Sequence, residues 1–91
     1  MRYTILKKHS TKSERRVYEV LKELKIPFKH RWMIEGKEAD FVIGKTILEI
    51  DGHPQEGNKN QIFVEAGYTP LHLTNEEVKD TNKLRKLIKQ L

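Results

Sequence analysis

The stretch EADFVIGKTILEID, residues 38–51, decides the fold of this 91-residue chain. Two runs rich in Val, Ile, Phe and Thr flank Gly44-Lys45, which is typical of a two-residue β-hairpin turn. Counting outward from that turn places Asp40 opposite Glu49. The pairs nearer the turn are Ile43–Thr46, Val42–Ile47 and Phe41–Leu48. We therefore predict a hairpin with acidic residues gathered toward its open end.

The acids of this hairpin form the first candidate site. Side chains alternate between the two faces of a strand, so four carboxylates are expected to project from one side. They are Glu38, Asp40, Glu49 and Asp51. Like charges directly opposite each other destabilise a strand pair, and a hard divalent cation such as Mg²⁺ (or Mn²⁺) would offset that repulsion. Asp40, Glu49 and Asp51 are the predicted metal ligands.

Composition limits the classes of function. The net charge is +5, which suits a polyanionic partner such as DNA, although a lysine-rich surface can also serve solubility alone. The absence of cysteine excludes disulfides, cysteine catalysis and thiolate zinc sites. The sequence shows no signal-peptide pattern and no segment long enough to span a bilayer. We expect one soluble, intracellular (cytoplasmic) domain over residues 1–91, without a membrane partner.

The remaining elements follow from periodicity and capping signals. A helix is predicted from Thr11 as N-cap to about Lys25, ended by Pro27. Strands are predicted over residues 28–34 and 68–73, a helix over 59–66 closed by Gly67, and one C-terminal helix after the capping pattern at 74–77. Pro70 places the last strand at a sheet edge. The order α-β-β-β-α-β-α predicts a mixed α/β layer fold with helices packed on a central sheet.

Glu14 is a second clue, because it shares the core-facing stripe of the first helix with Val17 and Leu21. A glutamate in that position is costly unless it is paired or bound to a cation. The plainer interpretation is a capping box in which Glu14 reaches back to Thr11. Both interpretations can hold together.

Clustered carboxylates with a bound metal beside a basic surface suit phosphodiester hydrolysis. His53 follows Asp51 by two residues and is the candidate base. The other histidines, His9, His30 and His72, are expected to be structural or surface residues. Trp32 is expected in the core or in a groove wall, with base stacking a minor alternative.

The strings SERRVYEVLKEL, ADFVIGKTILEIDGH and EAGYTPLHLTNEEV carry a resemblance that runs from Ser10 to Asp80. In order and spacing they resemble the small very-short-patch-repair (Vsr)-like endonucleases of the PD-(D/E)XK nuclease superfamily. Relatives of these enzymes include homing endonucleases with an E-D-x-H-D signature. The resemblance implies a restriction-endonuclease-like sheet flanked by helices and Mg²⁺-dependent DNA cleavage, often as a nick.

Carried over by motif, Glu14 resembles the helix-borne acid and Asp40 the metal-binding aspartate. Glu49 and Asp51 resemble the acids of the second strand, and His53 resembles the catalytic histidine. The family's histidine usually lies several residues beyond Asp-Gly, nearer to Glu56. The lysine of the wider superfamily motif would fall at Asp51, so no E-x-K is present, and the zinc site of the repair enzymes is absent. The candidates for DNA-backbone contact are Arg15, Arg16, Lys45, Lys59 and Gln61.

Three alternatives remain open. The chain could be a non-catalytic nucleic-acid-binding module on a nuclease scaffold. It could instead be an interaction domain whose acids only form salt bridges with Arg31, Lys37 or Lys45. A structure-specific junction resolvase is a variant of the nuclease hypothesis that would need a homodimer. A larger phage or host DNA-processing assembly is a further option for partners.

Overall fold

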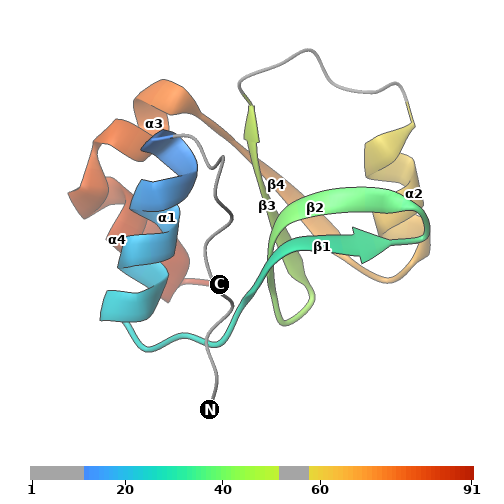
Figure 1. Cartoon of the computed structure of the whole chain (residues 1–91), viewed down its shortest axis with the longest axis horizontal. Coiled ribbons are helices and arrows are strands. Elements are labelled where there is room, and N and C mark those ends of the chain that lie inside the picture. Colours follow the sequence, from blue (N-terminus) through green and yellow to red (C-terminus); the bar gives the residue numbers. More distant parts are fainter. Residues whose placement is uncertain (1–11, 52–57) are drawn as a thin grey trace.

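The described part of the chain forms one four-stranded sheet in the order β1-β2-β3-β4 (Figure 1). The computed structural model describes residues 12–51 and 58–91, and only the backbone of Asp51. The strands are β1 (Lys29–Ile34), β2 (Lys37–Ile43), β3 (Thr46–Asp51) and β4 (Thr69–Thr74). The pairs β1–β2 and β2–β3 are antiparallel, and β4 is parallel to β3.

Helices cover both faces of the sheet (Figure 1). One face carries α1 (Lys12–Glu23), α3 (Asn75–Lys79) and α4 (Thr81–Lys89), and the other carries α2 (Lys59–Glu65). The larger core lies under α1, α3 and α4 and includes Val17, Leu21, Phe28, Phe41, Leu48, Leu73, Val78, Leu84 and Ile88. The smaller core lies under α2 and contains Ile34, Ala39, Val42, Ile47 and Phe63. The predicted mixed α/β layer fold is confirmed.

The turn and the edge strand also follow the sequence. The register pairs Ile43 with Thr46, and the next two predicted pairs are present as well. Gly44 has a φ of 58°, a left-handed conformation that glycine adopts without steric cost. Pro70 lies in β4 at the edge of the sheet, where its missing N–H costs least.

The C-terminal helix differs from the prediction of one continuous element. The predicted capping box is present: Glu77 N–H donates to Thr74 Oγ1 and Thr74 N–H donates to Glu77 Oε1, both at 3.1 Å. However, α3 then ends, and Asp80 caps a new helix by accepting the N–H of Lys83 at 3.2 Å. Aspartate is a strong N-cap residue, so this local signal overrides the continuous apolar stripe.

In both β1 and β2, the regular alternation of side chains between the two faces of the sheet is interrupted, at positions that lie side by side. His30 turns toward α1, whereas Ile34 packs in the core under α2, although residues four apart normally share a strand face. Arg31 lies between them with a φ of 51°, a left-handed conformation that is uncommon outside glycine. In β2 the change falls at Asp40, because Ala39 packs under α2 and Phe41 packs under α1.

This change of face leaves two large neighbouring side chains exposed. Trp32 and Met33 are 45% and 57% exposed, so the core placement expected for Trp32 is wrong. The ammonium of Lys29 lies 4.1 Å from the centroid of the Trp32 ring. The sequence pattern assumed an unbroken period of two, and the left-handed residue at position 31 interrupts it.

Phe63 anchors α2 to the sheet, because it is fully buried in the smaller core. We expect Phe63→Ala to lower the free energy of unfolding by about 3–5 kcal/mol, measured by urea denaturation. The matched control is Val64→Ala on the same helix, where the side chain is 57% exposed, and its cost should stay below about 1 kcal/mol. Equal losses for the two variants would show that α2 does not pack as described.

Candidate functional site

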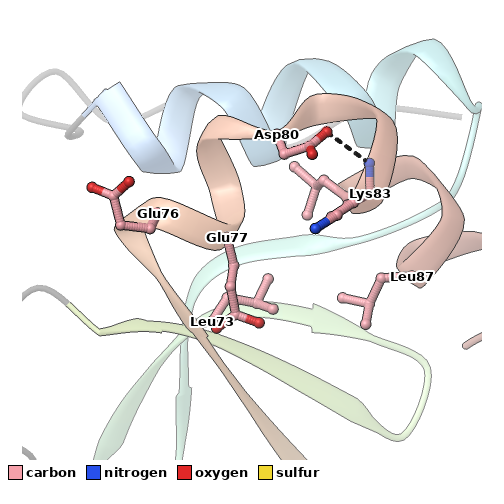
Figure 2. A pocket seen from close by; sticks show the side chains of 7 residues that line it. Leu73, Glu76, Glu77, Asp80, Lys83 and Leu87 are labelled. Atoms are coloured by element: carbon pink, nitrogen blue, oxygen red, sulfur yellow. Dashed lines mark hydrogen bonds between the residues drawn. The ribbon is translucent and has the colours of Figure 1, made fainter.

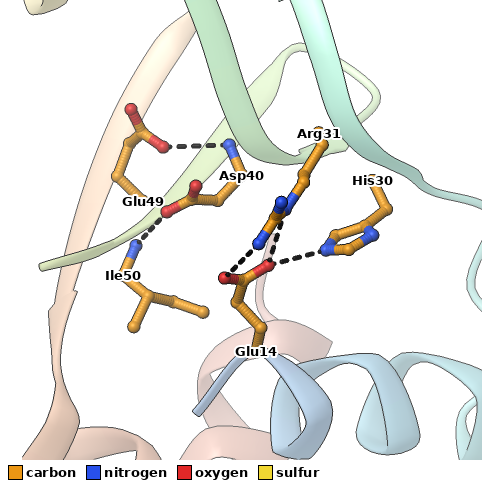
Figure 3. A network of polar contacts seen from close by, with 6 residues as sticks. All are labelled: Glu14, His30, Arg31, Asp40, Glu49 and Ile50. Carbon is orange, nitrogen blue, oxygen red and sulfur yellow. Dashed lines mark hydrogen bonds and ion pairs between the residues drawn. The ribbon is translucent and has the colours of Figure 1, made fainter. Parts of the chain in front are cut away.

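Asp40 and Glu49 replace backbone acceptors between β2 and β3 (Figure 3). The N–H of Asp40 donates to Glu49 Oε2 at 3.0 Å, and the N–H of Ile50 donates to Asp40 Oδ2 at 2.8 Å. Among the described residues, the β2–β3 register stops at Phe41–Leu48, one pair before these acids. The simple cross-strand pairing predicted for Asp40 and Glu49 is therefore wrong in detail. The two side chains are nevertheless neighbours, each fixed by the opposing strand.

Among the described residues, the register of β2 with β3 does not extend to Glu38 and Asp51, the outer acids of the hairpin. Glu38 is exposed and lies opposite Met33 of β1. The backbone of Asp51 pairs with Thr74 of β4. The side chain of Asp51 lies outside the described residues, so its predicted role as a ligand stays a prediction.

Burial makes the pair of acids electrostatically costly. Glu49 is only 3% exposed and Asp40 is half-buried. Burial, followed by the charge of Glu49, raises the pKa of Asp40 to about 7, against the opposing hydrogen bond from the N–H of Ile50. Burial and the charge of Glu49 therefore disfavour the ionised form of Asp40, a cost that a bound cation would offset.

Lys59 enters this site from the first turn of α2. Its Nζ lies 2.7 Å from Glu49 Oε1, while the other oxygen of Glu49 accepts the backbone N–H of Asp40. The sequence named Lys59 as a phosphate-contacting candidate, and the structure places it against a carboxylate. Both oxygens of Glu49 are thus engaged, one by a strand and one by a helix.

Glu14 reaches the same region from the start of α1 (Figure 3). It is 7% exposed, its Oε2 lies 2.8 Å from His30 Nε2, and its two oxygens accept bonds of 3.2 Å from Arg31. Burial raises the pKa of Glu14, but the bonds and charges of Arg31 and His30 outweigh it, so the net pKa lies below its usual value. The prediction that Glu14 faces the sheet in a paired state is confirmed. Its capping contact with Thr11 lies outside the described residues.

His30 completes this cluster as a buried residue. A carboxylate only accepts hydrogen bonds, so the Nε2 atom that faces Glu14 carries a proton. Among the described residues, Nδ1 of His30 is buried without a hydrogen-bond partner, and the ring packs 4.8 Å from the ring of Phe41. The geometry fits the structural role expected for His30.

The other predicted site residues are spread over the molecule. Arg15 is exposed on α1, and Lys45 lies at the hairpin turn with its Nζ 5.2 Å from the ring of Tyr68. Arg16 is half-buried and lines a hollow with Arg15, while exposed Gln61 donates to Glu65 at 3.1 Å. Lys45 is five residues from Asp40, about 16 Å along an extended strand. His53 and Glu56 lie outside the described residues.

The sequence did not predict the polar contact of His72 that lies beside Glu49. The parallel register pairs Glu49 with His72 of β4, and Nε2 of His72 donates to Asn60 Oδ1 at 2.8 Å. The signal was a histidine inside the apolar run Pro70–Leu73, but assigning it to the site required knowing that β4 lies beside β3.

The donor set fits a magnesium ion. Among the described residues, no group of three or more His, Asp or Glu side chains is arranged to hold a metal. Mg²⁺ keeps several waters and is commonly held by one or two carboxylates together with substrate phosphates. The adjacent carboxylates of Asp40 and Glu49 meet that requirement, and burial together with the charge of Glu49 raises the pKa of Asp40.

A hollow of about 520 Å³ lies elsewhere, between the end of β4 and helices α3 and α4 (Figure 2). Its lining mixes leucines with charged residues, namely Leu73, Glu76, Glu77, Asp80, Lys83, Leu84 and Leu87. Glu77 and Asp80 both serve as helix caps, which accounts for these two acids without a ligand. None of the predicted site residues lines it, so the carboxylate site remains the candidate.

A comparison with known proteins shows which fold this chain shares. Among solved structures, the chain is similar to the catalytic domain of the homing endonuclease I-Bth0305I, with a TM-score of 0.71 and 27% sequence identity. The similarity covers 89% of this chain and 93% of that chain. No protein-family model and no curated protein matches the sequence. The chain therefore has the fold of an endonuclease catalytic domain.

One further observation concerns membranes. None of the described helices combines the length and the apolar character that crossing a bilayer requires.

The raised pKa of Asp40 predicts an unusual pH dependence of stability. Between about pH 4 and pH 7 the folded protein holds a proton on Asp40 that the unfolded chain releases, so stability falls as pH rises through this window. In EDTA, we expect the free energy of unfolding to fall by on the order of 3 kcal/mol across the window. Asp40→Asn should flatten the profile, measured by urea denaturation at a series of pH values. A wild-type profile that rises steadily toward pH 7 would contradict the described burial.

Proposed function

We propose that this protein is a Mg²⁺-dependent (or Mn²⁺-dependent) DNA endonuclease that nicks one strand. In this proposal it is a Vsr-like enzyme of the E-D-x-H-D type within the PD-(D/E)XK superfamily. The observation that carries the proposal is the buried pair of carboxylates, Asp40 and Glu49, fixed between two strands beside Glu14. The similarity to a homing endonuclease catalytic domain supports the same class of substrate.

The proposed roles follow from the position of each group. Asp40 and Glu49 would hold the divalent ion, with Asp51 as a third carboxylate. A bound ion of this kind neutralises phosphate charge and lowers the pKa of a coordinated water. The hydrogen bonds from the N–H groups of Asp40 and Ile50 keep both carboxylates from turning away. His53 is proposed as the group that takes a proton from the attacking water.

Glu14 is proposed as a positioning residue. Its carboxylate is held by Arg31 and His30, so it lies fixed at the α1 side of the site. The positive charge of Arg31 is thereby placed close to Asp40. The pKa of Arg31 is raised, mainly by the hydrogen bond to Glu14 and to a smaller extent by the charge of Asp40. This arrangement keeps the guanidinium of Arg31 fixed beside the carboxylates.

The size of the chain limits how it reads DNA. A specific protein–DNA interface buries roughly 1,000 Å² or more of protein surface, which is a large share of the 6173 Å² total here. We therefore propose that cleavage is directed by DNA structure or is weakly specific, or that a second copy extends the interface. The net charge of +5 and exposed basic residues such as Arg15 and Lys45 supply the attraction to the backbone.

The direct test is nicking of supercoiled plasmid in Mg²⁺ or Mn²⁺, with EDTA as the metal-free control. We expect wild type to convert supercoiled to open-circular DNA and Asp40→Asn to lower the rate at least about 100-fold. The matched control is Glu76→Gln, which neutralises an exposed carboxylate on α3 and should cut like wild type. Intact plasmid with wild type across several divalent metals would refute the proposal. DNA binding that persists in EDTA would then favour the non-catalytic binding module.

A second test addresses the DNA-contacting residues. We expect Lys45→Ala to lower the slope of log affinity against log salt by roughly 0.9, the change expected when one phosphate contact is lost. Fluorescence anisotropy with a labelled duplex in EDTA measures binding without cleavage. The control is Lys79→Ala, because the ammonium of Lys79 is already paired with Glu76 at 3.1 Å. An unchanged slope for Lys45→Ala would remove this residue from the interface.

A further inference from the structure

Lys59 occupies a position for which a bound cation would compete. Its Nζ lies 2.7 Å from Glu49 Oε1, within a site whose second carboxylate has a pKa raised by burial and by Glu49. The Lys59 side chain is 25% exposed, whereas that of Glu49 is 4% exposed. The ammonium therefore lies at the boundary between the buried acids and solvent.

Contacts around Lys59 fix the first turn of its helix, and its ammonium also lies 5.8 Å from the centroid of the Phe63 ring. The next residue, Asn60, accepts a hydrogen bond from His72 of β4, and Phe63 is fully buried one turn later. Because His72 is the register partner of Glu49, these contacts fix the first turn of α2 beside β3. The backbone of Lys59 is thus fixed, and a flexible four-carbon stem links that backbone to the ammonium.

A lysine ammonium and a divalent ion bind the same carboxylate oxygens and repel each other at short range. A doubly charged ion at Asp40 and Glu49 therefore disfavours an ammonium 2.7 Å from Glu49 Oε1. The phosphate of a bound DNA strand offers that ammonium a new anionic partner at the same place. Lysine is well suited to this exchange, since it acts as a point charge without fixed bidentate geometry.

We propose that Lys59 is a resident counter-ion of the carboxylate site, paired with Glu49 in the metal-free protein and turned toward the scissile phosphate when a divalent ion is bound. The inference rests on the proposed endonuclease function and deepens it. It assigns Lys59 two successive partners and makes it a catalytic residue that the E-x-K pattern, with Asp51 at the lysine position, does not provide.

The test measures Mn²⁺ binding by electron paramagnetic resonance, without DNA and without turnover. We expect Lys59→Met to bind Mn²⁺ about fivefold more tightly than wild type, because the competing cation is gone. Lys59→Arg keeps the charge and should restore wild-type affinity. The matched control is Lys79→Met, which removes an ammonium from the exposed pair with Glu76 and should leave Mn²⁺ affinity unchanged. Thermal melts of all four proteins establish that each is folded.

Plasmid cleavage at saturating Mn²⁺ supplies the second readout. We expect Lys59→Met to lower the rate at least about tenfold despite its tighter metal binding, with Lys59→Arg recovering part of it. Unchanged or weaker Mn²⁺ binding by a folded Lys59→Met would overturn the inference, even if wild type cuts DNA and the proposed function stands. Wild type that neither binds Mn²⁺ nor cuts DNA would overturn both. A wild type that binds and cuts, with Lys59→Met binding more tightly and cutting less, would support the inference.

Discussion

The exchange of backbone and side-chain hydrogen bonds between Asp40 and Glu49 is the constraint on which the site depends. Each carboxylate is held by an N–H of the opposing strand, so neither can move without breaking the sheet at that level. An ordinary ladder would satisfy such N–H groups with backbone carbonyls. Here the acids are drawn between the strands, and burial raises the pKa of Asp40 to about 7. Ionisation of Asp40 therefore costs free energy in the folded protein.

The same level of the sheet also connects the site to α1. Arg31 has a left-handed backbone, and this places His30 toward α1 while later residues of β1 turn toward α2. A left-handed conformation outside glycine costs roughly 1 kcal/mol or more, so the contacts of Arg31 with Glu14 must offset it. The strain and the polar cluster are thus two parts of one arrangement that brings a helix-borne acid to the strand-borne acids.

Local signals in the sequence predicted most of the fold. Gly44 and the flanking β-branched residues fix the hairpin register near the turn, and Pro70 marks the edge strand. Asp80 could have been recognised as a cap, but the apolar stripe across it favoured one helix. The change of face at Arg31 could not be predicted, because it depends on Glu14, 17 residues earlier in the chain. Exposure of Trp32 follows from that long-range contact and not from its neighbours.

The residues of the candidate site could be named from the sequence, but their contacts could not. Glu14 was expected to face the sheet, and it does, but its partners come from a strand whose geometry the pattern did not reveal. Lys59 was expected near phosphate, whereas its contact with Glu49 needs α2 to lie across β3 and β4. Such contacts depend on parallel pairing of β3 with β4, and parallel pairing leaves no turn signal in the sequence.

The nearby cations affect Asp40 and Glu14 differently. Arg31 is committed to Glu14 from the α1 side and Lys59 to Glu49 from the α2 side, yet the pKa of Asp40 remains raised. If the acids served only to bridge elements, the nearby cations would be expected to hold that pKa low, as they do for Glu14. For Asp40, burial and the charge of Glu49 instead outweigh the hydrogen bond from the N–H of Ile50. A carboxylate that is costly to ionise in the folded protein is the feature on which the proposed metal-dependent cleavage rests.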